Sequence, residues 1–116
     1  MVNSLYCKLF IDSDKSVEEL ENIICLILGG KIHPIRTIEI KEAAFDLRIN
    51  KEFDLKKGKN KDDGFLYWKY FLDIEPIKTS KIDYINIVRD LMNQLKKQSI
   101  DSIAACDFED RLSINE

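Results

Sequence analysis

The strongest restriction on the fold comes from the order in which two hydrophobic periods follow one another. From Leu5 to Ile11 apolar side chains recur at every second residue, which indicates a strand. The next segment has apolar side chains at helical spacing, and the same pair of periods returns later in the chain. The first helical stripe consists of Val17, Leu20, Ile23, Ile24, Ile27 and Leu28. The chain therefore alternates strands with helices.

Both predicted helices carry start signals. Ser16 and Glu19 occupy the positions of a capping box, and the Gly29-Gly30 pair can take the left-handed conformation that ends the first helix. The Thr79-Ser80 pair can cap the second helix. Its apolar stripe consists of Tyr84, Ile85, Val88, Leu91, Met92 and Leu95. These signals predict two amphipathic helices, each packed by one face.

Three further strands complete the pattern. The second strand region runs from about residue 37 to residue 53, and its alternation changes parity near Lys41-Glu42, which favours a bulge. The third covers residues 65–75, after a lysine-rich connection, and the last covers residues 102–108. This order predicts an α+β fold of the ferredoxin-like βαββαβ sandwich type in one domain, residues 1–116. We expect a four-stranded antiparallel sheet of order 4-1-3-2 with both helices on one face.

Composition is consistent with a single globular domain. The chain has 116 residues, of which 45% are apolar and 34% charged. No run approaches the roughly 20 apolar residues of a membrane span. The N-terminal segment lacks the features of a signal peptide. These features predict a cytoplasmic protein without membrane contact.

The chain lacks motifs for catalysis. Cys7, Cys25 and Cys106 are far apart in the sequence, without the paired spacing of a zinc site, and the single histidine is His33. No nucleophile elbow or phosphate loop is present. We expect no catalytic residues, no metal and no cofactor, and therefore no enzyme. The strand pattern assigns Cys7 and Cys106 to the core, while Cys25 lies off the first helical stripe.

The segment DGFLYWKYF, residues 63–71, raises the question of function because it holds five aromatic side chains. As a continuous strand it directs Trp68 and Tyr70 towards the helices. The predicted sheet has one face without helices. Four aromatic side chains are expected in the middle of that face: Tyr6, Phe10, Tyr67 and Phe71. They are candidates for stacking on a nucleic acid or for anchoring a protein.

Carboxylates are expected beside these aromatics. The predicted third and fourth strands are parallel, so their ends lie at the same end of the sheet, beside the start of the second strand. Five acidic side chains then point from the uncovered face near that end: Glu39, Asp73, Glu75, Asp107 and Glu109. Such a cluster would repel a phosphate backbone and attract a basic surface.

Two segments resemble the signatures of RNA-recognition domains, which stack bases on aromatics of their first and third strands. They are residues 64–70, GFLYWKY, and residues 5–8, LYCK. The chain departs from that pattern at Asp63, Leu66 and Trp68, where the family carries a basic, a small and an aliphatic residue. The formal net charge is −3 and the pI is about 5.3, whereas a protein that binds a phosphate backbone needs a positively charged surface. We therefore expect no nucleic acid partner.

An acidic and aromatic surface suits a basic protein partner, because aromatics supply desolvated anchors and carboxylates orient cations. The segments YFLDIEP and AACDFEDRL, together with the chain as a whole, resemble bacterial immunity proteins of contact-dependent growth inhibition and related polymorphic toxin systems. The resemblance implies a toxin inhibitor that binds a basic cognate toxin domain. The predicted partner-binding residues are Tyr6, Glu39, Tyr67, Phe71, Asp73, Glu75, Asp107 and Glu109.

Other functions are compatible with the same pattern. The uncovered face could be a homodimer contact without any toxin, and ferredoxin-like modules also bind small ligands at dimer interfaces. An RNA-recognition-like role is a third alternative. A divalent cation at the carboxylates is disfavoured, because alternating strand residues spread their oxygens apart.

Overall fold

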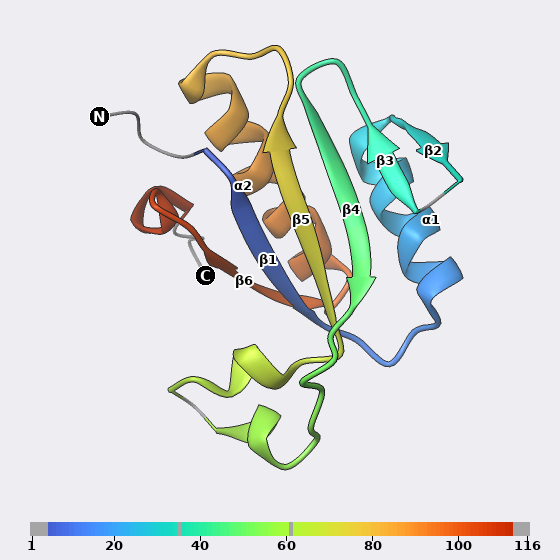
Figure 1. Ribbon diagram of the computed structural model, residues 1–116, viewed down its shortest axis with the longest axis vertical. Coiled ribbons are helices and arrows are strands. Elements are labelled where there is room, and N and C mark those ends of the chain that lie inside the picture. Colours follow the sequence, from blue (N-terminus) through green and yellow to red (C-terminus); the bar gives the residue numbers. More distant parts are fainter. Residues whose placement is uncertain (1–4, 35, 61, 113–116) are drawn as a thin grey trace.

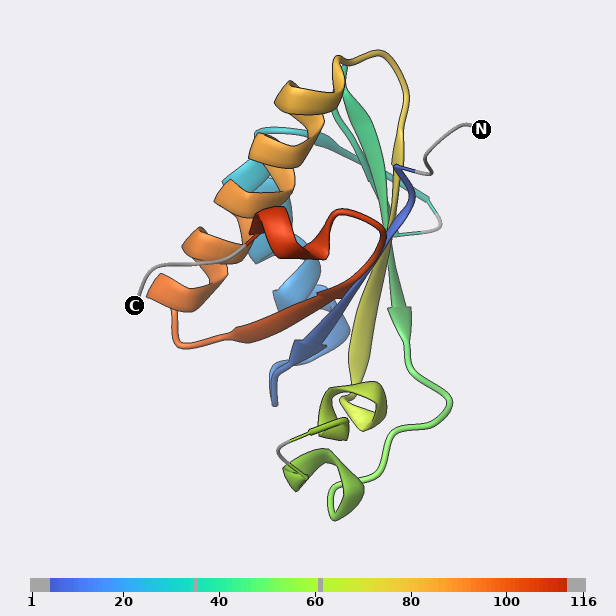
Figure 2. The same ribbon diagram turned by 90° about the vertical axis from the view of Figure 1, so that its left-hand side faces the viewer.

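The computed structural model describes residues 5–34, 36–60 and 62–112. It contains a six-stranded antiparallel sheet with both α-helices on the same face. The strand order is β2-β3-β4-β5-β1-β6. Figure 2 views the sheet from its side and shows the opposite face without a helix. The described residues thus form two layers.

The first helix forms where its capping signals predict. β1 (Cys7–Asp12) leads into α1 (Val17–Leu28). The Ser16 hydroxyl accepts from the Glu19 N–H at 3.2 Å, and the Glu19 carboxylate accepts from the Ser16 N–H at 3.3 Å, which confirms the capping box. Gly29 is left-handed at φ 67°, and its N–H bonds the Cys25 carbonyl at 2.8 Å. Local chemistry accounts for both ends of α1.

The second helix is also confirmed. β5 (Tyr70–Pro76) precedes α2 (Lys81–Lys97), which is followed by β6 (Asp101–Ala105). Ser80 caps α2 by accepting from the Asp83 N–H at 3.1 Å. All six residues of the predicted stripe are buried. One of them, Tyr84, donates its hydroxyl to the Ile74 carbonyl of β5 at 3.1 Å, so α2 is bonded as well as packed to the sheet.

The predicted four-stranded ferredoxin-like sheet is wrong, because β2 (Lys31–His33) and β3 (Thr37–Glu39) extend the sheet beyond β4 (Ala43–Ile49). The change of parity near Lys41-Glu42 is a reversal of the chain between two strands. The Ile40 N–H bonds the Ala43 carbonyl across this turn at 3.0 Å. β2 has three residues, all exposed, and only Ile32 is apolar, so the strand is too short for an alternating pattern to predict it.

The predicted third strand begins too early. Residues before Tyr70 form the 3₁₀ helices η1 (Lys57–Lys59) and η2 (Gly64–Tyr67). Residues 50–60 and 62–69 make a protrusion at one end of the sheet, here called the loop lobe. Buried Asn50 holds it together by donating to the Leu66 and Trp68 carbonyls at 2.9 and 2.7 Å. In this segment, hydrogen bonds from a side chain to the backbone take the place of the expected strand pairing.

The predicted last strand is also shorter than expected. It ends at Ala105, and the chain turns into the 3₁₀ helix η3 (Glu109–Leu112), which packs against α2. Phe108 is buried there, with its ring 5.7 Å from that of Tyr84. Phe108 is therefore core, but it packs from a turn and not from the sheet.

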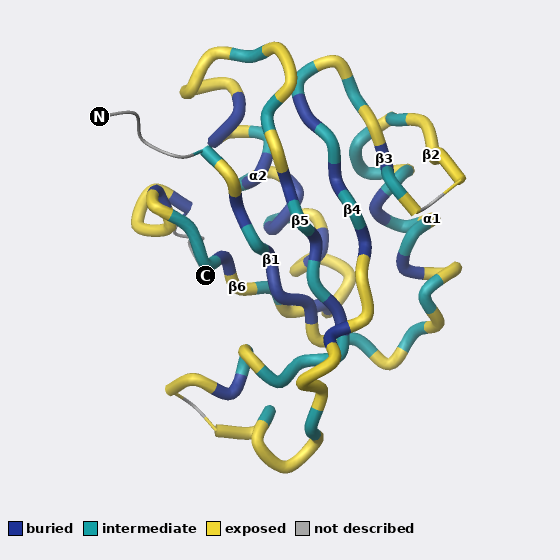
Figure 3. The backbone as a smooth tube through the Cα atoms, in the orientation of Figure 1, coloured by how far each residue is buried: buried dark blue, intermediate teal, exposed yellow. Residues whose placement is uncertain are grey.

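The core lies between the sheet and the helices. Figure 3 shows buried residues along β4, β5, β1 and α2, whereas the loop lobe is mostly exposed or half-buried. The largest fully buried side chains include Tyr70, Tyr84 and Phe45. None of the helices within the described residues is long and apolar enough to cross a membrane.

Candidate functional site

The uncovered face of the sheet holds five of the eight predicted partner-binding residues. They are Tyr6, Glu39, Phe71, Asp73 and Glu75. Side chains alternate between the faces of a strand, and Ala44 of β4 lies opposite both Glu39 and Glu75, so these two share a face. Tyr6 precedes β1 and donates its hydroxyl to Asp73.

Two carboxylates on this face, Asp46 and Asp73, have partners within the domain. Asp73 accepts from the Arg48 Nε at 3.1 Å and from the Tyr6 hydroxyl. The Arg48 guanidinium also lies 3.6 Å from Asp46, which accepts from the Thr37 hydroxyl. Burial, and then the hydrogen bond to Asp73, raises the pKa of Tyr6, which keeps this phenol a donor. The result is a cross-strand network in which the one charge of Arg48 is shared between Asp46 and Asp73.

The aromatics of this face pack on one another. The Phe10 ring lies 5.4 Å from that of Phe65 in an edge-on arrangement and 6.1 Å from that of Phe71. The Lys8 ammonium lies 4.2 Å from the centre of the Phe71 ring. Phe10 is consequently buried although it faces away from both α-helices. These rings attach the loop lobe to the sheet and do not form an open stacking platform.

The other three predicted residues lie elsewhere. Tyr67 belongs to η2, where the Lys57 ammonium sits 5.1 Å from its ring centre. Glu109 begins η3 and accepts from the Cys106 N–H at 3.3 Å. Asp107 is exposed in the preceding turn. The expected cluster of aromatics and five carboxylates is therefore not assembled, because β5 starts after Tyr67 and β6 ends before Asp107.

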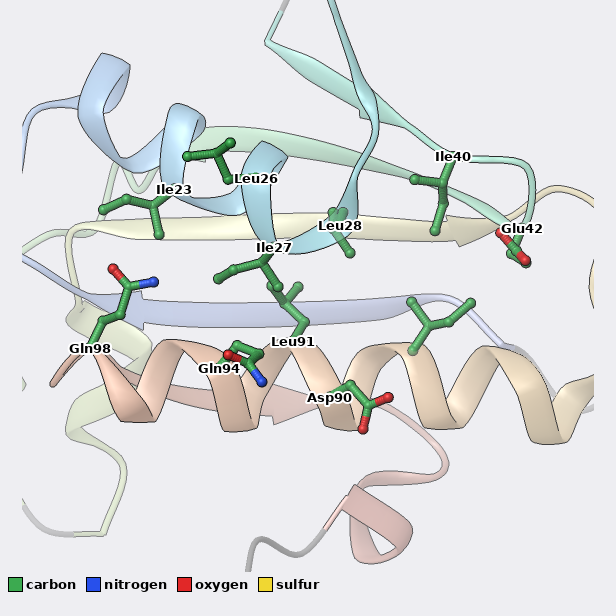
Figure 4. Close-up of a pocket in the computed structure, with 11 residues that line it drawn as sticks. Ile23, Leu26, Ile27, Leu28, Ile40, Glu42, Asp90, Leu91, Gln94 and Gln98 are labelled. Carbon is green, nitrogen blue, oxygen red and sulfur yellow. The ribbon is translucent and has the colours of Figure 1, made fainter.

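A groove between the two helices is a second candidate surface, and Figure 4 shows its lining. Its volume is about 940 Å³. The lining residues are Ile23, Leu26, Ile27 and Leu28 of α1, Ile87, Asp90, Leu91 and Gln94 of α2, and Ile40, Glu42 and Gln98. Leu26 is 83% exposed, whereas Leu91 is fully buried. The groove therefore joins a buried apolar side to an exposed apolar wall.

The polar residues of the groove carry only negative charge or no charge. Glu42 lies near Ile40 at one end, Asp90 projects from the middle of α2, and two glutamines complete the lining. The sequence of α1 contains three glutamates and no lysine or arginine. An acidic rim around an aliphatic surface is the combination that recognises an apolar partner with cationic flanks.

This groove was not predicted from the sequence, although α1 carries a signal for it. All six residues of the predicted α1 stripe pack on the core, with Leu20 and Ile24 fully buried and the other four partly buried. Leu26 lies outside that stripe and was not considered. The apolar face of α1 is wider than the area that packing on the sheet can cover. This excess width indicated a further surface.

The remaining titratable groups of residues 5–34, 36–60 and 62–112 are not placed together as a catalytic or metal site. Asp12, Asp14 and Asp101 line a hollow of about 380 Å³. Burial, followed by the charges of Asp101 and Asp14, raises the pKa of Asp12. Among the described residues, no three His, Cys, Asp or Glu side chains are placed to hold a metal ion.

The thiols lie in different environments. Cys7 is fully buried, and Cys106, which was expected in the core, is half-buried. Burial, and then the neighbouring Cys106, raises the pKa of the Cys7 thiol, which disfavours the nucleophilic thiolate. The His33 imidazole lies 3.2 Å from Glu39, on the edge strand β2.

The fold and these surfaces define a two-layer α+β domain with a groove of aliphatic and polar lining in its helix layer. No family model and no solved structure matches the chain. Over 87 residues, 75% of this chain, it is 34% identical to a protein of Malacoplasma penetrans (strain HF-2) named 1-deoxy-D-xylulose-5-phosphate synthase. The chain spans 13% of the length of that curated relative. The likeness therefore concerns a small part of a much longer protein.

Proposed function

We propose that this chain is a non-enzymatic protein-binding module and that its partner docks in the groove between α1 and α2. The observation that carries the proposal is Leu26, a large apolar side chain that is 83% exposed in the wall of a groove of about 940 Å³. Exposed apolar surface with a polar rim is typical of protein-binding sites.

The groove is a better docking surface than the uncovered face of the sheet. On the sheet, Asp73 is bonded to Arg48 and Tyr6, and Phe10 is covered by neighbouring rings, so a partner would have to displace interactions already made. In the groove, burying Leu26 removes apolar surface from water without breaking any such bond.

The most specific form of the proposal is neutralisation of a basic bacterial toxin domain in the cytoplasm. It is supported by the net charge of −3 and by the resemblance of segments such as YFLDIEP and AACDFEDRL to immunity proteins. A basic toxin domain would be attracted over a distance by this charge and then held by apolar contacts.

Co-expression with the product of the adjacent gene tests the proposal. The two proteins should co-purify, and the chain should relieve any toxicity of that product. Leu26→Ser should weaken the complex by about tenfold or more, because it removes an exposed anchor without disturbing the core. Ile82→Ser is the matched control, since Ile82 is 65% exposed on α2 and does not line the groove.

A third variant separates the two surfaces. Phe71→Ala alters the uncovered face of the sheet and should leave the complex intact. The proposed docking surface is wrong if Phe71→Ala disrupts the complex while Leu26→Ser does not. Protein binding of this kind is itself contradicted if the two products neither co-purify nor affect one another.

A further inference from the structure

The chemistry of the groove restricts what can occupy it, and this inference rests on the proposed function. We propose that the occupant is an amphipathic α-helix of a partner protein, with an aliphatic stripe and with lysine or arginine beside that stripe. The two parts of this description follow from the shape of the groove and from its charge.

The shape of the groove suits a helix. Its walls are two helices, and the order of the labelled residues in Figure 4 shows that α1 and α2 run antiparallel. The shorter wall, α1, has 12 residues and is therefore about 18 Å long. A partner helix of about three turns would match this length and present anchors at spacings of three and four residues. Leu26 and Ile23 on one wall and Ile87 on the other would contact such a stripe.

The charge of the groove selects cations beside the stripe. Glu42 and Asp90 are acidic, and none of the described lining residues is Lys, Arg or His. The C-terminal end of α1 points towards the end of the groove that holds Ile40 and Glu42 and has no basic residue in its last turn. Its carbonyl groups therefore add to the negative potential there. Lysine or arginine on the partner helix would pair with these groups, and glutamate would be repelled.

A second copy of this chain fits the groove less well. The helix with the most exposed apolar surface is α1, which carries glutamates and no cation, so docking it in the groove of another copy would bring like charges together. Such repulsion opposes self-association at low salt. The preferred occupant thus differs in charge from the chain itself.

Two synthetic peptides of about 18 residues test this inference. Both carry the same leucine stripe at helical spacing, one flanked by lysine and the other by glutamate. Binding of each labelled peptide to the full chain is measured by fluorescence anisotropy at about 0.02 M and 0.5 M salt. The lysine peptide should bind about tenfold more tightly or better at low salt, and the difference should narrow at high salt. Leu26→Ser should weaken its binding about tenfold, Ile82→Ser should not, and Asp90→Lys should reduce the preference for lysine.

The outcomes separate the inference from the proposed function. If both peptides bind equally well and both depend on Leu26, the groove binds proteins but the selection for cations is wrong. If neither peptide binds, or if binding is unaffected by Leu26→Ser, docking in the groove is wrong. If the chain forms a dimer that Leu26→Ser dissociates, the occupant is a second copy and the inference is overturned.

Discussion

Gly64 lies where two turns of the loop lobe touch. A Cβ atom at this position would stand 2.7 Å from the Gly58 carbonyl oxygen and 3.0 Å from the Lys57 carbonyl oxygen. Both atoms are backbone and cannot rotate away. At Gly58, by contrast, a Cβ atom would stand 3.4 Å from the edge of the Trp68 ring and 3.8 Å from the Gly64 and Tyr67 carbonyl oxygens, which are ordinary contact distances. The two glycines are close in space but differ in the room around them.

Gly64→Ala should therefore destabilise the protein by about 1–3 kcal/mol, because the lobe must shift to admit the methyl group. Gly58→Ala is the control and should change the free energy of unfolding by no more than about 0.5 kcal/mol. Urea denaturation followed by circular dichroism measures both. Equal stabilities of the two variants would show that the contact between η1 and η2 is looser than described.

At the scale of elements, the pairing of β1 with β6 places like charges together. Asp12 lies directly opposite Asp101 in the antiparallel register, and Asp14 is close in sequence. Burial, followed by the charges of Asp101 and Asp14, raises the pKa of Asp12 above its ordinary 3.8. Above pH 3.8 the folded protein therefore holds this proton more tightly than the unfolded chain does. The free energy of unfolding must fall as pH rises through that window.

Asp12→Asn should remove this penalty. Its melting temperature should exceed that of the parent by about 1–3 °C at pH 7. The increase is small because Asp12 is exposed and water screens the repulsion. The difference in melting temperature should vanish near pH 3, where Asp12 is protonated. Asp62→Asn, an exposed change in the loop lobe, serves as the control. If the melting temperature of Asp12→Asn exceeds that of the parent by the same amount at pH 3 as at pH 7, charge repulsion is not the cause.

The whole molecule shields Cys7, which lies in the core between the sheet and the helices with no exposed surface. Its thiol also has a raised pKa, caused first by burial and then by Cys106. Cys25 and Cys106 are half-buried at the margins of the same core. Labelling of Cys7 should thus require the chain to open as a unit.

Under native conditions, iodoacetamide should label Cys7 at least about 10³-fold more slowly than Cys25, because a free energy of unfolding of about 5 kcal/mol or more opens the core in fewer than about one molecule in 10³. Peptide mass spectrometry gives the three rates separately. Adding urea should speed the labelling of Cys7 in parallel with the loss of circular dichroism. Cys7 labelling as fast as that of Cys25 in the folded protein would contradict the assigned core.

Features that depend on near neighbours in the chain were predictable from the sequence. The capping box of Ser16 and Glu19, the left-handed Gly29 and the Ser80 cap all formed, because each involves groups no more than four residues apart. The α2 stripe was predictable for a related reason. All six of its residues are buried, because the sheet, η3 and α1 together cover that face of the helix.

Features that depend on distant neighbours were decided only by the tertiary structure. Ile40 to Glu42 could have been a bulge or a reversal, and the pairing of β3 with β4 selects the reversal. Phe65 and Tyr67 lie outside the strand that was predicted for them. Asn50 donates to the Leu66 and Trp68 carbonyls, and the Trp68 indole donates to the Gly58 carbonyl, and these bonds hold the loop lobe instead. The predicted acidic site is dispersed because β6 ends at Ala105, before Asp107 and Glu109.

The candidate groove shows the same division. The sequence of α1 determined that the helix would be apolar over much of its surface, because that property belongs to its own side chains. Which of those side chains are covered depends on where β3, β4 and α2 come to lie, and these elements bury Leu20 and Ile24 but leave Leu26 exposed. Burial is a property of the assembled neighbours, and so the exposed wall of the groove exists only in the tertiary structure.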